Sequence, residues 1–252
     1  MKSNHSYTLI SLKAVFFFFS FLVIISCSKK TDPPAIISGS SNTNVNPDAM
    51  DTGKITYLAL GDSYTIGESV SPTDRFPVQL VNMLQKENVN VKSPDIVAVT
   101  GWTTGNLLNA LQSESLKHNY TFVTLLIGVN NQYQGRSLEE YRTQFSRLLD
   151  SAIHFAGNNR KNVFVLSIPD YSVTPFASGS DQENIALQID EFNSANKIIS
   201  ENSGVQYVDI TPISRNAKND LSLVAPDGLH PSGIQYSKWD ELLAPLVLKA
   251  IK

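Results

Sequence analysis

Residues 55–63 read Ile-Thr-Tyr-Leu-Ala-Leu-Gly-Asp-Ser, and this stretch decides the fold class. Its first six residues form a short apolar run with a β-branched and an aromatic residue, which is typical of a buried strand. The run stops at Gly61-Asp62-Ser63. A carboxylate and a hydroxyl at the carboxyl end of a buried strand lie where α/β proteins place their chemistry. The same three residues also suit a turn followed by a helix N-cap, and the stretch alone leaves both interpretations open.

Strand-like runs alternate with helical patterns along the rest of the chain. We predict further strands at Asp95–Thr100, Thr121–Ile127, Asn162–Ile168 and Val205–Ile210, and helices at Phe76–Glu87, Thr103–Leu116, Ser137–Phe155, Asp181–Asn202 and Pro231–Ile251. The strands are apolar on both faces, which indicates a parallel sheet covered by helices on both sides. The pattern therefore predicts an α/β protein, a three-layer α/β/α sandwich with a five-stranded parallel sheet. A proline suits the first turn of the last helix.

The first 52 residues do not have the pattern of a folded domain. Lys2 and Lys13 precede a 12-residue apolar run, Ala14 to Ile25, which is the layout of a secretory signal peptide. The run is short for a helix that crosses a bilayer, although a retained membrane anchor stays an alternative. We expect a signal peptide at 1–26, a flexible tether rich in Ser, Asn, Asp and Pro at 27–52, and one domain at 53–252.

Cys27 is the single cysteine of the chain, so no internal disulfide is available. Ile24-Ile25-Ser26-Cys27 resembles the lipobox of bacterial lipoproteins, in which the cysteine is lipidated and becomes the first residue of the mature protein. The resemblance implies a lipid-anchored protein of the bacterial cell envelope, periplasmic or on the outer surface. An ordinary unpaired cysteine within a signal peptide is the alternative.

Polar residues and glycines follow the predicted strands at one edge of the sheet. Gly61-Asp62-Ser63 follows the first strand, Gly101 the second, Gly128-Val129-Asn130 the third, and Asp227-Gly228-Leu229-His230 comes after the fifth. In a parallel sheet these strand ends converge on one rim. A hydroxyl, an amide, glycines and an Asp/His pair are the groups that acyl transfer needs.

His230 is the histidine that this arrangement places on the rim. His5 lies in the signal peptide, His118 at the opposite edge of the sheet, and His154 on the polar face of a helix. Asp227 precedes His230 by three residues, a spacing that lets its carboxylate accept from Nδ1 while Nε2 faces a substrate. A serine hydroxyl is a weak nucleophile and needs such a base.

The ordered set of blocks resembles the SGNH/GDSL hydrolases, serine esterases and lipases with a flavodoxin-like fold. The resemblance runs from Lys54 to the C-terminus. It implies that Ser63 is the nucleophile, His230 the general base and Asp227 the group that orients it. It also implies an oxyanion hole formed by the backbone N–H groups of Ser63 and Gly101 and the side chain of Asn130.

Two positions depart from the usual pattern of that family. Tyr64 stands where leucine is usual, and Asn131 where aspartate is more usual. Neither has an assigned proton-transfer role, so both are expected to shape the crevice. Asp62 either caps the turn after the first strand or supports the site. Trp102, Tyr133, Tyr171 and Phe176 lie in rim loops, where they either stack on sugars or belong to the core.

The expected activity is hydrolysis of carboxylic esters, with removal of acetyl groups from envelope glycans as the first expectation. A lysophospholipase or short-chain lipase, an acyltransferase, and an inactive binding protein on the same fold are the alternatives. No cofactor is expected, and no metal, because motifs such as His-Glu-x-x-His are absent from the sequence. The formal net charge of −3 does not favour nucleic acid as a partner. We expect a monomer whose membrane contact is the lipid at Cys27.

Overall fold

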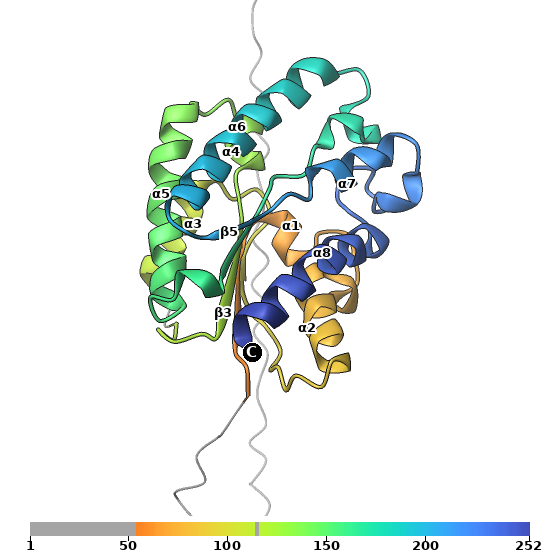
Figure 1. The fold of residues 1–252 in the computed structure, drawn as a ribbon. Coiled ribbons are helices and arrows are strands. Elements are labelled where there is room, and N and C mark those ends of the chain that lie inside the picture. The colour runs from red at the N-terminus through yellow and green to blue at the C-terminus, as the bar shows by residue number, and fades with distance from the viewer. Residues whose placement is uncertain (1–53, 114–115) are drawn as a thin grey trace, which may run out of the picture. The chain divides into compact units, whose positions relative to one another are not determined.

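Five parallel strands form the middle layer of the computed structural model, which describes residues 54–113 and 116–252 (Figure 1). The strands are β1 (Tyr57–Gly61), β2 (Asp95–Ala98), β3 (Phe122–Leu126), β4 (Val163–Leu166) and β5 (Gln206–Val208). Their order across the sheet is β2-β1-β3-β4-β5, the flavodoxin-like order. The predicted parallel sheet is confirmed. In this order the chain reverses direction beside β1, which places the crevice at the carboxyl ends of β1 and β3.

Helices cover both faces of the sheet, as predicted. On one side lie α3 (Thr104–Ser113), α5 (Leu138–Phe155) and α6 (Gln182–Asn202), and on the other α2 (Phe76–Lys86) and α8 (Gly233–Ile251) (Figure 1). Side-chain caps explain several of these starts. Ser137 accepts the backbone N–H of Glu140 ahead of α5, and Asp181 accepts that of Asn184 ahead of α6.

The start of α8 corrects one prediction. The helix begins at Gly233 and not at Pro231, because the hydroxyl of Ser232 caps it by accepting the backbone N–H of Gln235. Pro231 instead pairs with Val224 in an isolated antiparallel bridge. This bridge closes the loop that carries Asp227 and His230.

Short helices fill the connections at the strand ends and were not predicted. They are α1 (Ser63–Ile66), α4 (Val129–Tyr133) and α7 (Thr211–Arg215), with 3-10 turns at Pro72–Asp74, Arg160–Asn162, Tyr171–Val173, Pro175–Ala177, Asn216–Lys218 and Leu221–Leu223. Elements of three to five residues are too short to show a helical hydrophobic period. Two of them, α1 and α4, carry predicted site residues.

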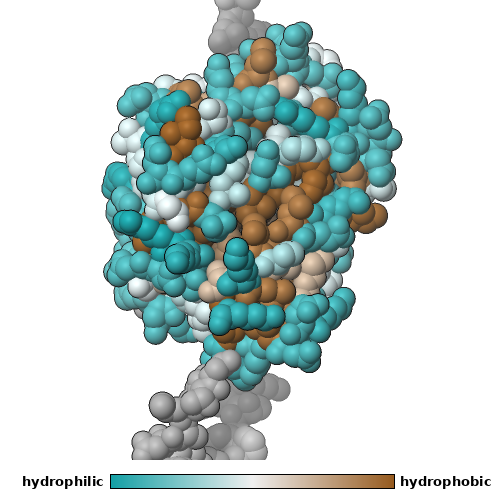
Figure 2. All heavy atoms as spheres, viewed as in Figure 1, coloured by the Kyte–Doolittle hydropathy of each residue, from teal (hydrophilic) through white to brown (hydrophobic). Residues whose placement is uncertain are grey.

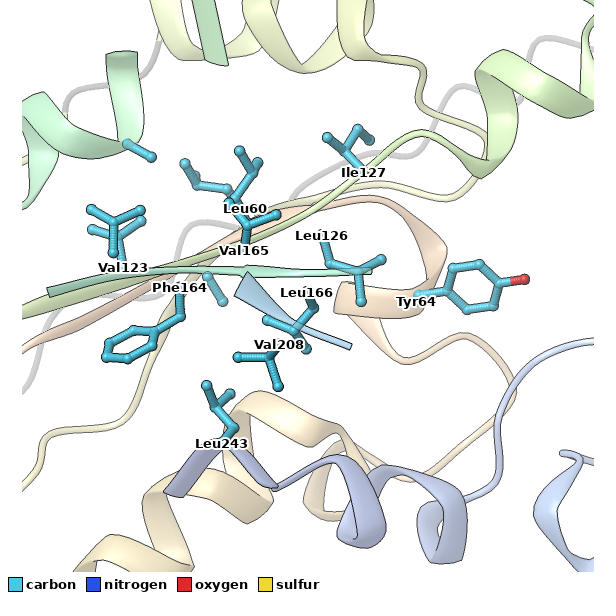
Figure 3. Close-up of a cluster of buried hydrophobic side chains, with 14 of the residues drawn as sticks. Leu60, Tyr64, Val123, Leu126, Ile127, Phe164, Val165, Leu166, Val208 and Leu243 are labelled. Atoms are coloured by element: carbon cyan, nitrogen blue, oxygen red, sulfur yellow. The ribbon is translucent and has the colours of Figure 1, made fainter. Parts of the chain in front are cut away.

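The core lies between the sheet and its two helix layers. All residues of β1, β3 and β4 are buried, and each large apolar side chain of this kind contributes about 1.5–3 kcal/mol by burial. In Figure 3, Leu60, Leu126, Val165 and Leu166 pack from neighbouring strands. The side chain of Tyr64 lies at the end of this cluster, and its hydroxyl points away from it (Figure 3). The core therefore ends at the rim where the predicted site residues lie.

Polar residues cover most of the face drawn in Figure 2, with a hydrophobic patch near its middle. Within 54–113 and 116–252, no helix has the length and apolar character needed to cross a membrane. The predicted signal peptide, the tether and Cys27 lie outside the described residues.

Candidate active site

Four of the five predicted site residues line one pocket at the carboxyl ends of the strands. The pocket has a volume of about 150 Å³. Its lining residues are Ser63, Tyr64, Thr100, Gly101, Val129, Asn130, Tyr133, Tyr171, Phe176, Leu229 and His230. Asp227 lies directly behind His230. Residues that are up to 167 positions apart in the chain are thus brought to one place by the sheet order.

Ser63 is the first residue of α1, separated from the end of β1 by Asp62 alone. Asp62 caps this helix, because its Oδ1 accepts the backbone N–H of Tyr64 at 3.1 Å. Gly61 leaves no room for a side chain, since a Cβ there would overlap the side chain of Thr65 and the carbonyl oxygen of Leu126. The glycine lets α1 fold closely over the end of the sheet, which sets Ser63 at the pocket.

The cap residue Asp62 is fully buried, and its second oxygen, Oδ2, has no hydrogen-bond partner among the described residues. Burial raises the pKa of Asp62 to about 7, although backbone N–H groups, those of Tyr64 and Gly128 among them, oppose the rise. The capping role that the sequence left open is therefore observed. The carboxyl group of this capping residue is partly protonated near neutral pH.

Asp227 and His230 form a close pair. Nδ1 of His230 lies 2.6 Å from Oδ2 of Asp227, and Oδ1 accepts the backbone N–H groups of Leu229 and His230 at 2.9 and 3.0 Å. Oδ2 also accepts the hydroxyl of Ser69 at 2.7 Å. Partial burial works to raise the pKa of Asp227, but these hydrogen bonds outweigh it and hold the pKa at about 2. An ionised carboxylate can only accept, so Nδ1 carries the proton and Nε2 is left free to act as a base.

The three residues predicted to supply oxyanion donors all line the pocket. The N–H of Ser63 is at the start of a helix, where backbone donors lack intrahelical partners. Gly101 has φ +83°, a left-handed conformation that favours glycine. The side-chain nitrogen of Asn130 donates to the carbonyl of Trp102 at 2.9 Å, which engages one of its two N–H groups and leaves the other available.

Of the two departures from the family pattern, Tyr64 lines the pocket and Asn131 does not. Asn131 is fully buried and bonds to Thr104 at the start of α3. The ring of Tyr64 packs on the ring of His230, with centroids 5.6 Å apart and planes at 66°. An edge-on aromatic contact of this kind supports the orientation of the imidazole. The expectation that Tyr64 shapes the crevice agrees with its place in the pocket wall.

An aromatic wall, made of Tyr133, Tyr171 and Phe176, lines one side of the pocket. The three ring centroids are 6.1 to 6.3 Å apart. Tyr133 and Phe176 are 60% and 46% exposed, so their faces are open to a ligand. Trp102 does not line the pocket and packs, half-buried, against the core.

Some residues at the site had no role assigned from the sequence. Val129 and Leu229 line the pocket, and Ser69 bonds to Asp227 across 158 positions of sequence. No short motif connects residues so far apart. The other described histidines, His118 and His154, pack against each other, 5.0 Å apart, outside this pocket. In the described ranges no three His, Cys, Asp or Glu residues are grouped in a way that suits a metal ion.

Comparison with known proteins agrees with this architecture. The sequence model of the GDSL-like Lipase/Acylhydrolase family matches residues 59–237, more than half of the chain. No curated protein sequence matches the chain.

Solved structures with the same fold include three bacterial proteins. The acetylxylan esterase Axe2 from Geobacillus stearothermophilus is 19% identical, with 80% of this chain and 96% of that chain covered and a TM-score of 0.57. The psychrotrophic esterase EstA from a Pseudoalteromonas species is 17% identical, with 77% and 97% covered and a TM-score of 0.56. A member of the lipolytic G-D-S-L family from Veillonella parvula is 18% identical, with 77% and 97% covered and a TM-score of 0.57. At such identities the similarity establishes the fold alone.

Proposed function

Given that this chain belongs to the GDSL-like lipase/acylhydrolase family of ester hydrolases, we propose that Ser63, His230 and Asp227 carry out its reaction as a catalytic triad. The observation that supports this assignment is the shared pocket of Ser63 and His230, with Asp227 held 2.6 Å from Nδ1 of the histidine. A base whose tautomer is fixed in this way is what a serine nucleophile requires.

The proposed reaction has two steps. Ser63 Oγ attacks the ester carbonyl carbon while Nε2 of His230 takes the hydroxyl proton, and the carbonyl oxygen becomes an oxyanion. The C–O bond to the alcohol then breaks, and His230 returns the proton to the leaving alcohol. Water attacks the acyl-serine in the same manner, which releases the carboxylic acid and restores Ser63.

Charge on the oxyanion is stabilised, in this proposal, by the backbone N–H groups of Ser63 and Gly101 and by the side chain of Asn130. Each such donor typically lowers the barrier by about 3 kcal/mol. Asp227 stays ionised throughout, which stabilises the imidazolium that forms on His230. The ester supplies the acyl group and the leaving alcohol, water supplies the hydroxyl of the acid, and His230 carries the proton in both steps.

We further propose that the substrate carries a small acyl group such as acetyl on a glycan. A pocket of about 150 Å³ is smaller than the roughly 300–1,000 Å³ of pockets that hold drug-sized ligands. Such a volume favours a short acyl chain over a long one. The aromatic wall offers open faces of Tyr133 and Phe176, and amphipathic rings of this kind suit the apolar face of a sugar.

The test is hydrolysis of p-nitrophenyl acetate, butyrate and octanoate by the purified full-length protein in detergent, with Ser63→Ala as the control. We expect the fastest turnover on acetate and its loss in the variant. Preference for octanoate would instead favour the lysophospholipase or lipase alternative. Hydrolysis that survives in Ser63→Ala would remove the serine from the mechanism, and absence of any hydrolysis would favour a binding protein on this fold.

We also propose that the protein is a lipoprotein of the bacterial cell envelope, anchored through Cys27. The support is the Ile24-Ile25-Ser26-Cys27 sequence after an apolar run. Wild-type protein is expected in the detergent phase of a membrane extract, with a diacylglyceryl mass at the N-terminal cysteine. Cys27→Ser should abolish both signals, and an unmodified wild-type cysteine would overturn the assignment.

A further inference from the structure

The turn that follows α1, residues 67–70, is attached directly to the backbone of Ser63. The backbone N–H groups of Gly67 and Glu68 both donate to the carbonyl oxygen of Ser63 at 3.0 Å. A displacement of this turn would therefore move Ser63 with it. Side chains of the same turn also form hydrogen bonds with Asp227 and Thr100, in two other loops at the site.

Two neighbouring side chains of the turn reach those segments. The hydroxyl of Ser69 donates to Oδ2 of Asp227 at 2.7 Å, and Oδ2 is the same oxygen that faces Nδ1 of His230. The carboxylate of Glu68 accepts the hydroxyl of Thr100, the residue before Gly101. One short turn thus joins the helix of Ser63 to the Asp227 loop and to the Gly101 loop.

The backbone of Ser69 is in an unusual conformation for its residue type. Its φ is +62°, in the left-handed region where glycine, asparagine and aspartate are favoured. Residues held in such conformations tend to cluster at functional sites, where the surrounding contacts over-determine them. A glycine would adopt this φ without strain but would lack the hydroxyl that bonds to Asp227.

We propose that Ser69 is a positioning residue of the ester hydrolase. Its hydroxyl holds the carboxylate of Asp227 opposite Nδ1 of His230, and its turn, which is bonded to the backbone of Ser63, keeps this pair at a fixed position relative to Ser63. The inference rests on the proposed function, since it assigns a role through the Asp227–His230 pair. Ser69 is exposed, so water can replace part of its hydrogen bond. We therefore expect an effect smaller than that of losing a buried partner of a charged group.

The first experiment compares Ser69→Ala with Ser222→Ala. The hydroxyl of Ser222 also donates to a carboxylate, Oδ1 of Asp220 at 2.6 Å, but it lies outside the pocket. For p-nitrophenyl acetate we expect kcat of Ser69→Ala to fall by about fivefold with KM unchanged, and Ser222→Ala to behave as wild type. In an Asp227→Ala background the effect of Ser69→Ala should disappear, because the residue acts through that carboxylate. Equal effects in both backgrounds would overturn the proposal.

A second variant, Ser69→Gly, and a second measurement, the proton resonance of His230, distinguish a positioning role of Ser69 from an effect on folding. Ser69→Gly relieves the left-handed strain, so its Tm should stay at or above that of wild type while kcat falls as in Ser69→Ala. The proton resonance of His230 Nδ1–H, which needs no turnover, should broaden in both Ser69 variants and stay sharp in Ser222→Ala. An unchanged resonance would overturn the proposal even in a protein without esterase activity. Hydrolysis that persists in Ser63→Ala, by contrast, would refute the proposed function alone.

Discussion

Asn131 and Thr104, both fully buried, are joined by two hydrogen bonds. Oδ1 of Asn131 accepts the backbone N–H of Thr104 at 2.9 Å, and Nδ2 donates to the hydroxyl of the same residue at 2.7 Å. The pair ties the start of α4 to the start of α3. Because Asn130 precedes Asn131 and Gly101 lies just before α3, the pair holds two predicted oxyanion donors at a fixed separation.

Asn131→Ala should therefore lose both stability and turnover. The buried N–H of Thr104 would be left without a partner, which costs about 1–3 kcal/mol in the free energy of unfolding. We expect kcat for p-nitrophenyl acetate to fall by roughly tenfold. Asn131→Asp, which introduces the residue usual in the family, keeps the Oδ1 acceptor and should retain more of both. Urea unfolding and steady-state kinetics measure the two effects, and equal behaviour of the two variants would contradict this account.

Asn130→Ala should lower kcat strongly and leave the fold intact. Loss of one oxyanion donor costs about 3 kcal/mol in the transition state, a hundredfold or more in kcat, whereas the stability loss is limited to one hydrogen bond to the carbonyl of Trp102. Gln134→Ala is a matched control, because this exposed amide donates to the carbonyl of the neighbouring Gly101 at 3.4 Å. Near-normal kcat in Asn130→Ala, measured beside an unchanged Tm, would remove Asn130 from the site.

The sheet and its long helices could be predicted because each leaves a pattern of its own. Strands buried on both faces are continuous apolar runs, and α5, with 18 residues, is long enough to show its apolar stripe. The parallel arrangement then placed Ser63 and His230 on one rim. The start of α8 was predicted wrongly, because the cap at Ser232 and the proline two residues before the helix are both common start signals.

The finer structure of the site could not be predicted, since it depends on contacts across long stretches of sequence. The hydrogen bond between Ser69 and Asp227 spans 158 residues, and no local pattern marks it. The aromatic residues were placed in rim loops, but whether their rings met each other or the core depended on how those loops fold. The sheet order decides which loops are neighbours, and the loop geometry decides which side chains touch.

Tyr133→Ala should separate recognition of a glycan from the chemistry of the ester. The side chain is 60% exposed, so we expect an unchanged Tm. The KM for an acetylated oligosaccharide, the substrate class proposed above, should rise several-fold through the loss of a stacking surface, while kinetics on ethyl acetate, which has no ring to stack, stay as in wild type. Leu187→Ala is the control, because Leu187 is 59% exposed on α6 and lies outside the pocket wall. An equal change for both esters would indicate that Tyr133 serves the pocket's structure instead.

Asp62 should make the folded protein less stable as pH rises towards neutrality. Its pKa in the folded state is about 7, against an ordinary value of 3.8. Between these values the folded protein holds a proton that the unfolded chain has lost, so the free energy of unfolding falls as pH rises. The effect is absent below pH 3.8 and complete above pH 7, where the difference in pKa corresponds to at most about 4 kcal/mol.

Asp62→Asn isolates this contribution. The amide keeps the Oδ1 acceptor for the backbone N–H of Tyr64 but does not titrate. We expect the free energy of unfolding in urea to fall less between pH 4.5 and pH 8 in the variant than in wild type. Burial also raises the pKa of Asp240, but that residue is present in both proteins and cancels in the difference. Parallel pH profiles would mean that Asp62 is ionised in the folded protein throughout this range, and the buried carboxyl would then require a partner for Oδ2.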